Sequence, residues 1–170
     1  MDIVRLRSGR RVGIRPIQPD DGPRLQAAYE RLSPESRYRR FLALKPRLTA
    51  GEARYLAEID GATHVAEVAT TLDEPPKIVA VARFVRGVDD DPDAAEFAIV
   101  VDDEFQGDGL GTELLERLVV AAHKLGIARF RASVLATNEA AHRLMRRLAA
   151  RQTERRPTGV VDEYEFELAA

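Results

Sequence analysis

The sequence predicts one mixed α/β domain in which a central, mostly antiparallel sheet is flanked by helices. Three observations support this prediction. The chain has 170 residues, 45% of them hydrophobic, which suits a single buried core, so residues 1–170 are expected to form one domain. Apolar residues recur at every second position in some segments and with a helical period in others. Clusters of Gly, Pro and Asp separate these segments, and neither a repeat nor a linker interrupts them.

The first third of the chain predicts a β-hairpin followed by three helices. The turn Ser8-Gly9-Arg10 separates the two strands of the hairpin, residues 3–7 and 12–15. Residues that accept backbone hydrogen bonds mark the three helix starts: Asp20 or Asp21 before Pro23, Ser33 before Pro34, and Thr49, which Glu52 follows as in a capping box.

The rest of the chain predicts strands that alternate with helices. The expected strands are residues 64–72, 77–85, 95–101, 128–135 and 160–168, and the expected helices are residues 110–126 and 138–149. The turn Asp73-Glu74-Pro75-Pro76 joins the first two strands as an antiparallel pair. The order strand, helix, strand, helix, strand over residues 95–168 predicts one parallel pair in the sheet, at the second crossover.

Composition excludes several classes of protein. The chain has no cysteine, so disulfides, thiolate metal sites and an acyl-cysteine intermediate are impossible, and His64 and His123 lack ligand spacing, so no metal is expected. A pI near 6.0 argues against nucleic-acid binding. No apolar run reaches membrane-spanning length and the N-terminus lacks the apolar region of a signal peptide, so no membrane contact and a cytoplasmic location are expected.

The small net charge of −2 conceals an uneven distribution of charge. Residues 1–50 carry 12 basic and 5 acidic residues, residues 51–116 carry 4 and 17, and residues 117–170 carry 10 and 6. This pattern fits an ordinary solvated surface, and it equally fits a field that attracts an anion at one place and a cation at another. The acidic loop Asp89–Asp93 is expected to favour a cationic acceptor.

The stretch FQGDGLGT, residues 105–112, places three glycines where a strand ends and a helix begins. Such a turn exposes unpaired backbone N–H groups at the positive end of a helix dipole, which suits a phosphate or pyrophosphate. The alternative is a tight turn that binds nothing. Thr112 stands where a dinucleotide-binding motif needs its third glycine, and the lysine of a P-loop is missing, so both of those motifs are excluded.

The spacing of Gln106, Gly109 and Gly111 resembles the acyl-coenzyme A motif of the GNAT superfamily of N-acetyltransferases. The resemblance covers nearly the whole chain, including the strand EFAIVVDDEF, the helix TELLERLVVAAHKLG and the segment ATNEAAHRLMRRL. The N-terminal text RPIQPDDGPRL…RLSPESRYRRF is similar to the acetyltransferase domain of bacterial protein-lysine acetyltransferases of the Pat group. The resemblance implies a GNAT-like sheet, and it implies acetyl-CoA as the acyl donor.

The resemblance also implies roles for particular residues. Glu96 aligns with the glutamate that is the general base of the similar lysine acetyltransferases, with Glu67 and Glu104 as lesser candidates. Asn138 fits a pantetheine contact, and the amide of Val101 fits an oxyanion-type donor. The residues implied to bind acetyl-CoA are Ile99, Val100, Val101, Gln106, Gly107, Asp108, Gly109, Leu110, Gly111, Thr112 and Asn138.

The chain departs from the family pattern at two places. Many members carry a tyrosine general acid seven residues after the motif asparagine, whereas this chain has Met145, and Ala149-Ala150 replaces the usual Gly-Phe. His142 lies on the helical face of Asn138 and could reach the coenzyme sulfur, although a packed or solvated histidine is the preferred interpretation. Arg37-Tyr38-Arg39-Arg40 is interpreted as a solvated helix face beside a buried Phe41, in preference to a nucleic-acid site.

The leading hypothesis is an acetyl-CoA-dependent N-acetyltransferase that acts on a primary amine by direct attack in a ternary complex. A protein lysine is the first choice of acceptor, and a small cationic amine is the alternative. A non-catalytic acyl-CoA sensor is the hypothesis from a different class. A homodimer is compatible with the sequence, which leaves the oligomeric state open.

Overall fold

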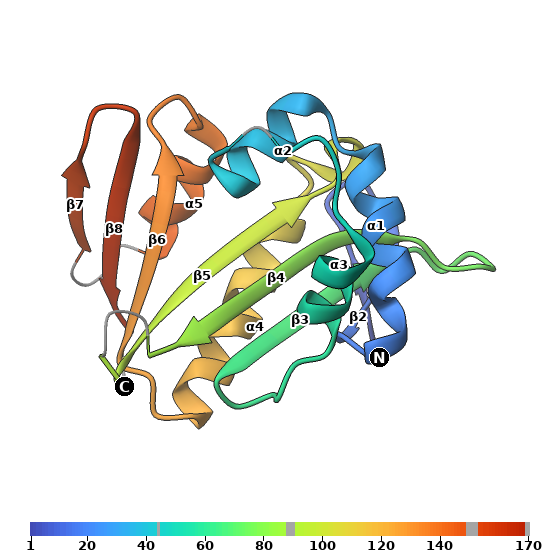
Figure 1. The fold of residues 1–170 in the computed structure, drawn as a ribbon, viewed down its shortest axis with the longest axis horizontal. Coiled ribbons are helices and arrows are strands. Elements are labelled where there is room, and N and C mark those ends of the chain that lie inside the picture. The colour runs from blue at the N-terminus through green and yellow to red at the C-terminus, as the bar shows by residue number, and fades with distance from the viewer. Residues whose placement is uncertain (44, 88–90, 149–152, 169–170) are drawn as a thin grey trace.

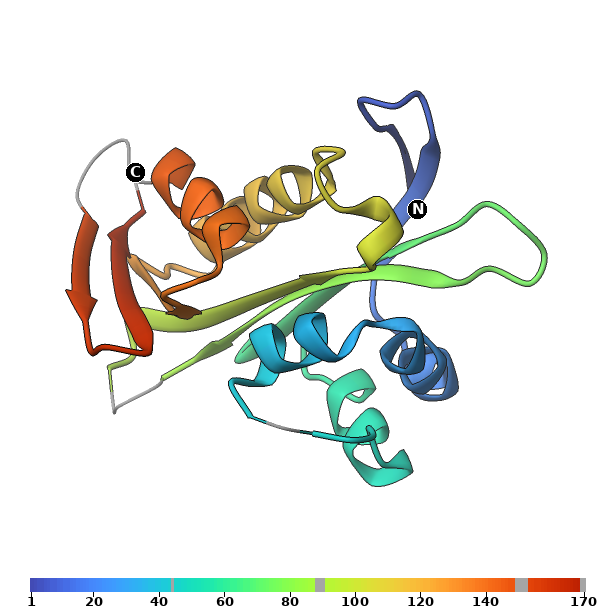
Figure 2. The ribbon, with the colours of Figure 1, turned by 90° about the horizontal axis from the view of Figure 1, so that it is seen from above.

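A single eight-stranded sheet runs through the computed structural model, with helices packed on both of its faces (Figure 1, Figure 2). The structure describes residues 1–43, 45–87, 91–148 and 153–168. The strands are β1 (Asp2–Arg5), β2 (Arg11–Pro16), β3 (His64–Thr70), β4 (Ile78–Arg86), β5 (Ala94–Val101), β6 (Arg129–Leu135), β7 (Thr153–Pro157) and β8 (Val161–Glu167). The helices are α1 (Gly22–Arg31), α2 (Pro34–Phe41), α3 (Ala50–Ala57), α4 (Leu110–Lys124) and α5 (Glu139–Leu148), and the short 3-10 turns are η1 (Pro19–Asp21) and η3 (Asp103–Phe105).

The strand order is β1-β2-β3-β4-β5-β6-β8-β7. All neighbouring pairs are antiparallel except β5 and β6, which confirms that the sheet is mixed and has one parallel pair. This pair lies across α4, at the first of the two crossovers. At the second crossover β6 and β8 are antiparallel, because β7 follows α5 and the chain then reverses into β8. The strand β7 was not expected, because its sequence TERRP shows no alternation of apolar and polar residues. It pairs only with β8, so it needs no buried face of its own.

Two hydrophobic cores lie on opposite faces of the sheet. One packs α4 and α5 against the sheet through residues such as Phe84, Leu118 and Phe130. The other packs α1, α2 and α3 on the opposite face, where Tyr29 and Val68 are buried (Figure 2). Of the described helices, none has the length and apolar character that a membrane span requires.

Two of the three expected helix caps are confirmed. Ser33 accepts a hydrogen bond from the amide of Ser36, and Thr49 and Glu52 form the expected capping box. Asp21 occupies the cap position of α1 but its side chain does not cap the helix. Its fully buried carboxylate instead accepts from both terminal nitrogens of Arg15, at 2.6 and 2.8 Å, and from the amide of Gln18. The carboxylate therefore joins α1 to β2.

The strands β5 and β6 diverge towards the end of the sheet where α2 and α5 lie (Figure 1). Their pairing extends only from Ala94 and Arg129 to Glu96 and Arg131. On its other side β5 stays paired with β4 as far as Val101. Beyond Glu96, one edge of β5 therefore has no strand partner.

Candidate active site

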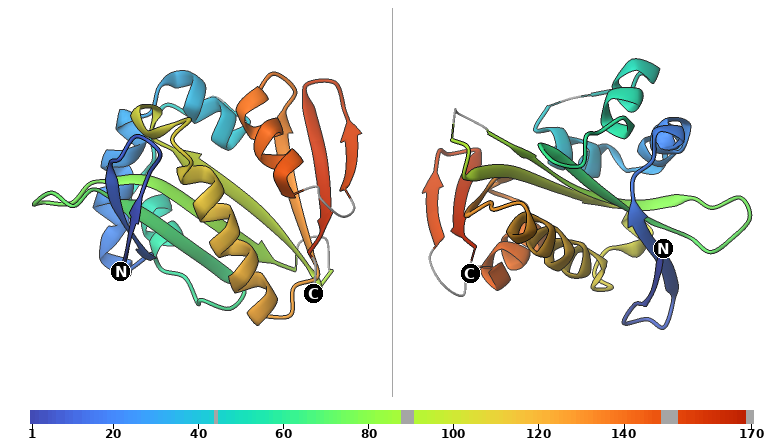
Figure 3. Two further views of the ribbon diagram at one scale, coloured as in Figure 1. Left: turned by 180° about the vertical axis from the view of Figure 1, so that it is seen from behind. Right: turned by 90° about the horizontal axis from the view of Figure 1, so that it is seen from below.

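A cleft of about 310 Å³ lies where β5 and β6 are no longer paired, beside the C-terminal end of β5. Strand β5, the glycine-rich loop, α2, α5 and the turn between β1 and β2 all contribute to it (Figure 1, Figure 3). Nine of the eleven residues expected to bind acetyl-CoA line it: Ile99, Val100, Val101, Gln106, Gly107, Gly109, Gly111, Thr112 and Asn138. The side chain of Leu110 packs in the core instead, and that of Asp108 points elsewhere.

Two of the loop glycines adopt backbone conformations that a side chain disfavours. Gly107 has a φ of +73° and Gly109 a φ of +91°, both in the left-handed region. Gly111 has no such requirement, and a Cβ there would meet Leu144 and Val101 at ordinary contact distances of 3.8 and 3.9 Å. The backbone of the loop therefore does not require a glycine at position 111. Gly111 instead keeps this part of the cleft wall free of a side chain.

The loop presents backbone N–H groups that no other part of the described protein binds. The amides of residues 107–111 form no hydrogen bond within the described residues, whereas the next two amides bind the carbonyl of Gly109. These are the orphan donors of the first turn of α4 and of the loop before it. Together with the helix dipole they form a site for a phosphate group.

The carboxylate of Asp108 fastens the loop to the first hairpin. The carboxylate accepts hydrogen bonds from the amide and hydroxyl of Ser8 and from the side chain of Arg10. The backbone carbonyl of Asp108 accepts a further hydrogen bond from the amide of Arg7. Hydrogen bonds from Ser8 and Arg10 hold the pKa of Asp108 below its usual range. The prediction that Asp108 binds the coenzyme is therefore limited to its backbone, because its side chain faces away from the cleft.

The open edge of β5 presents alternate backbone groups to the cleft. Asp102 donates its amide to the carbonyl of Val79, so the even-numbered residues of β5 exchange hydrogen bonds with β4. The odd-numbered residues, Ile99 and Val101 among them, direct their N–H and C=O groups to the opposite edge. The amide of Val101 thus faces the gap, as the role of an oxyanion donor requires, while the polar backbone groups of Val100 belong to the sheet.

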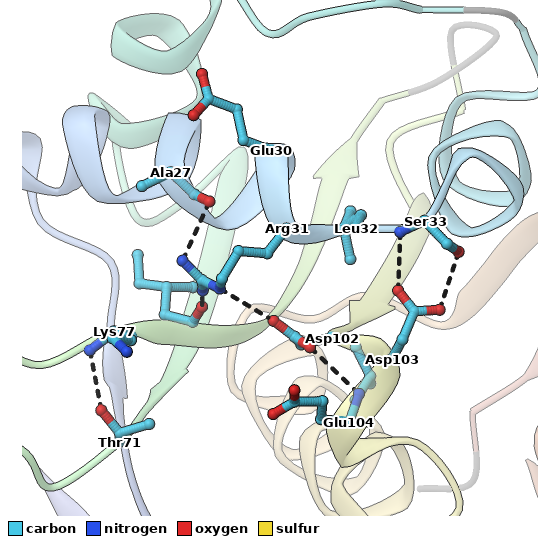
Figure 4. A network of polar contacts seen from close by, with 12 residues as sticks. Ala27, Glu30, Arg31, Leu32, Ser33, Thr71, Lys77, Asp102, Asp103 and Glu104 are labelled. Carbon is cyan, nitrogen blue, oxygen red and sulfur yellow. Dashed lines mark hydrogen bonds and ion pairs between the residues drawn. The ribbon is translucent and has the colours of Figure 1, made fainter.

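A polar network ties α2 to the end of β5. The side-chain nitrogen of Gln106 donates to the hydroxyl of Ser36 at 3.2 Å and to the carbonyl of Val101 at 3.0 Å. The carboxylate of Asp103 accepts from the amide and hydroxyl of Ser33 (Figure 4). It also accepts from the hydroxyl of Ser36. Burial alone would raise the pKa of Asp103, but these hydrogen bonds outweigh it and hold the pKa below its usual range. The side chain of Gln106 therefore shapes the cleft.

Positive charge dominates the lining of the cleft. The described lining residues include no acidic side chain and five arginines: Arg7, Arg39, Arg40, Arg143 and Arg147. An acyl-coenzyme A, which is long and carries several phosphates, fits the free amides, the open strand edge and this positive field. Sequence reasoning missed the arginines. The spacing of Arg143 and Arg147, which places both on one face of α5, was the signal that could have revealed two of them.

Glu96 lies at the point where β5 and β6 separate, opposite Arg131 in the register. Its side chain is exposed and lies outside the residues that line the cleft. Ala95 and Phe97 pack in the core under α4, so alternation along the strand directs Glu96 to the face that carries α1, α2 and α3. Glu67, a lesser candidate, lies on the opposite face beside Arg117, where burial raises its pKa.

Helix α5 carries the second motif. The side-chain oxygen of Asn138 accepts from the amide of Ala141, so Asn138 caps α5 and also lines the cleft. His142 is buried and binds the hydroxyl of Tyr164 and two backbone carbonyls, which confirms that it is packed. Met145 is buried in the core, so this helix position does not face the cleft. Ala149-Ala150 lies outside the described residues.

One expectation about a charged segment is wrong, and a second is tested at Asp91 alone. The arginines of α2 are not a solvated face, since Arg37 donates to the carbonyls of Glu30, Leu32 and Pro46 while Arg40 lines the cleft. The carboxylate of Asp91 is not available to a cationic acceptor, because it forms ion pairs with Arg129 at 2.7 Å and Arg131 at 3.1 Å. Asp89 and Asp90 lie outside the described residues. The described residues contain no cluster of side chains arranged to hold a metal ion.

The chain belongs to the acetyltransferase (GNAT) family, whose model matches residues 23–150. It therefore carries the acyltransferase domain of this family, whose fold uses acetyl-CoA. It is 37% identical over 147 residues to the acetyltransferase Pat from Mycolicibacterium smegmatis, in an alignment that covers 86% of this chain and 43% of Pat. The chain thus spans less than half of that relative.

Solved structures confirm the fold. The GNAT domain of PAT from S. lividans has a TM-score of 0.87 and 33% identity to this chain, covering 98% of this chain and 96% of that domain. The structure of yncA from Salmonella typhimurium with acetyl-CoA has a TM-score of 0.74 and 19% identity, covering 94% and 95% of the two chains. The second likeness concerns the fold alone.

Proposed function

We propose that this chain transfers the acetyl group of acetyl-CoA to a primary amine, with a protein lysine as the first choice of acceptor. The observation that carries the proposal is the meeting of three features in one cleft: the open edge of β5, the free amides of the glycine loop and the arginine lining. The likeness to Pat supports a lysine acceptor. The chain has no cysteine, so direct attack of the amine in a ternary complex is the simplest route.

The protein binds and orients the donor through backbone groups. The amides of residues 107–111 hold the pyrophosphate, and the odd-numbered residues of β5 bind the pantetheine arm. The amide of Val101 stabilises the charge that develops on the thioester oxygen, an effect worth about 3 kcal/mol for a well-aimed donor. Gln106 holds the carbonyl of Val101 in place and so keeps this amide aimed at the gap.

The amine must arrive neutral. A lysine-like amine with a pKa of about 10.4 costs about 4.6 kcal/mol to deprotonate at pH 7. Glu96 is the proposed general base. Its side chain emerges on the face of β5 opposite to α4, beside the charge of Arg40, which lines the cleft. Because Glu96 does not itself line the cleft, a water molecule relays the proton. The thiol leaves as a thiolate without a tyrosine acid, since its pKa of about 8.5 is low.

The change Glu96→Gln tests the base. We expect the turnover number for amine acetylation to fall by about 10²- to 10⁴-fold. The affinity for acetyl-CoA is expected to stay unchanged, because Glu96 lies outside the cleft lining. Free thiol release with acetyl-CoA and a panel of lysine peptides, polyamines and small amines measures turnover, and calorimetry measures affinity.

Glu116→Gln is the matched control, since Glu116 is an exposed residue of α4. Wild-type turnover by Glu96→Gln would remove Glu96 from the mechanism. Activity on polyamines but on no lysine peptide would favour the small-amine alternative. A wild-type protein that binds acetyl-CoA tightly and acetylates nothing would favour the sensor.

A further inference from the structure

A second, smaller cavity of about 60 Å³ adjoins the cleft between β4 and the helices α1, α2 and α3. Its walls are mostly apolar, with Leu25, Leu56 and Val81 among them. Two residues, Arg40 and Val100, line both this cavity and the cleft. The cavity is therefore a side pocket of the acyl-transfer strand, with room for a few water molecules or a short chain that ends in a small polar group.

Arg83 brings a buried positive charge into this side pocket. It is 6% exposed, and one of its terminal nitrogens donates to the carbonyl of Leu56 at 3.2 Å and contacts Nε2 of His64 at 3.0 Å. Neither contact supplies a negative charge. Because an arginine side chain can only donate, Nε2 of His64 is the acceptor of this hydrogen bond. Burial also lowers the pKa of His64, which favours its neutral form. Among the described residues, no carboxylate lies within ion-pair distance of Arg83.

Arg40 adds a second positive charge at the mouth of the side pocket. Its guanidinium contacts the ring of Phe41 at 4.8 Å and forms neither an ion pair nor a hydrogen bond with the described residues. The positive charges of Arg40 and Arg83 repel each other. Burial and the charge of Arg40 together lower the pKa of Arg83 to about 9. Arg83 nevertheless remains cationic at neutral pH. Asp102, the acidic residue of the lining, is paired with Arg31.

Two neighbouring guanidinium groups in an apolar wall need negative charge. Glu96 supplies one negative charge near Arg40, but no contact joins the two residues. Taking a guanidinium out of water without a partner is unfavourable, and its rigid fork of donors matches a carboxylate in particular. We propose that Arg40 and Arg83 form a carboxylate subsite beside the acyl-transfer strand. The inference rests on the function proposed above and specifies the substrate that this site takes.

The carboxylate has two chemically sensible sources. It belongs either to the far end of a dicarboxylic acyl donor, such as a succinyl group, or to the acceptor, as an acidic residue beside the reactive lysine. Both sources are within the chemistry of the site, because the cleft and the side pocket meet at Arg40 and Val100. In either case the amine displaces the thiolate from the acyl carbon, and the carboxylate itself does not react.

The donor arm of the test compares succinyl-CoA with butyryl-CoA, a chain of similar length without the charge. If the donor supplies the carboxylate, the wild-type protein binds succinyl-CoA roughly tenfold or more tightly than butyryl-CoA. Arg83→Gln, which lies outside the cleft lining, abolishes this preference and leaves the affinity for acetyl-CoA within about twofold. Arg40→Gln abolishes the preference as well, and it also weakens acetyl-CoA binding because Arg40 lines the cleft. The exposed Arg54 of α3 provides the matched control, Arg54→Gln, which keeps the preference.

The acceptor arm uses acetyl-CoA and two peptides that differ by Glu or Gln next to the lysine. If the acceptor supplies the carboxylate, wild type has the higher kcat/KM on the Glu peptide, and Arg40→Gln equalises the two. No preference in either arm would overturn the proposal, as would a preference that survives both variants. A protein that prefers succinyl-CoA yet acetylates no amine would retain the subsite and overturn the proposed function.

A melting measurement separates a binding role from a structural one. Because no carboxylate among the described residues pairs with the buried charge of Arg83, we expect Arg83→Met to melt at or above the wild-type temperature. Succinyl-CoA should raise the melting temperature of wild type more than butyryl-CoA does if the donor supplies the carboxylate, and should lose this advantage in the variant. A large fall in melting temperature for Arg83→Met would assign Arg83 a structural role and contradict the proposal.

Discussion

At the residue scale, Gly109 and Gly111 of FQGDGLGT have different reasons to be glycine. Gly109 needs a φ of +91°, and a Cβ there would also meet the side chain of Arg7 at 3.4 Å. Gly111 lies in the first turn of α4 with no positive φ and no close neighbour. Gly109 is therefore required by the loop, and Gly111 by whatever lies in the cleft.

Replacing each glycine by alanine should separate these two reasons. We expect Gly109→Ala to lower the free energy of unfolding by about 1–2 kcal/mol, the cost of a side chain in the left-handed region. Gly111→Ala should keep or raise it by up to about 1 kcal/mol, because alanine favours the helix. Both variants should bind acetyl-CoA less tightly. Urea unfolding and calorimetry measure the two quantities, and equal losses of stability would contradict this account.

At the element scale, α2 depends on the polar network that joins it to the end of β5. Asp103 receives three hydrogen bonds from Ser33 and Ser36, and Gln106 bridges Ser36 and Val101. Arg31 and Asp102 fasten the end of α1 to the same segment (Figure 4). The position of α2 over the cleft, and with it that of Arg40, follows from these contacts.

The network should make stability depend on pH. The pKa of Asp103 is lowered in the folded protein, so its ionised form stabilises the fold above the unfolded pKa of about 3.9. This contribution is lost as pH falls through the lower folded pKa. We expect Asp103→Asn to cost about 1 kcal/mol at pH 7, a modest value because the side chain is exposed. Urea unfolding should show the difference shrinking towards pH 3, and a constant difference would contradict it.

At the scale of the whole molecule, the fold gathers arginines from both ends of the chain at one cleft. Arg7 comes from the first hairpin, Arg39 and Arg40 from α2, and Arg143 and Arg147 from α5. The acidic middle segment lies partly in ion pairs, and its Asp108 is turned from the cleft by Ser8 and Arg10. The uneven charge of the sequence thus becomes a positive field in the cleft where we propose that the donor phosphates bind.

This field predicts a binding affinity that depends on salt. Arg143→Gln and Arg147→Gln should each weaken acetyl-CoA binding roughly two- to fivefold at low salt, and less at high salt, because exposed charges are screened. Arg146→Gln is the matched control, since Arg146 is exposed on the same helix and does not line the cleft. Calorimetry at two salt concentrations measures the effect. An equal loss for Arg146→Gln would mean that net charge, rather than position, controls affinity.

Much of the site was predictable because its signals are local. Free amides, positive φ values and a helix start depend on neighbouring residues, so the loop of residues 105–112 and the capping residues Ser33 and Thr49 were readable from the chain. Asp21 and Asp108 were misread for the opposite reason. Their partners, Arg15 and Ser8, come from β2 and from the turn before it, and the carboxylates bind those partners instead of the nearest helix end or ligand.

The order of elements and the phosphate-binding turn follow from hydrophobic period and glycine spacing, which act over a few residues. The divergence of β5 from β6, the direction of each backbone group along β5 and the meeting of Arg40 with Arg83 depend on how distant segments pack. Whether a buried charge destabilises the fold or binds a ligand depends on the groups beside it, and only the tertiary structure shows which groups those are. For this reason a phosphate-bearing ligand, which the resemblance to the GNAT superfamily implies is acetyl-CoA, could be inferred before the structure, whereas a carboxylate subsite could be proposed only after it.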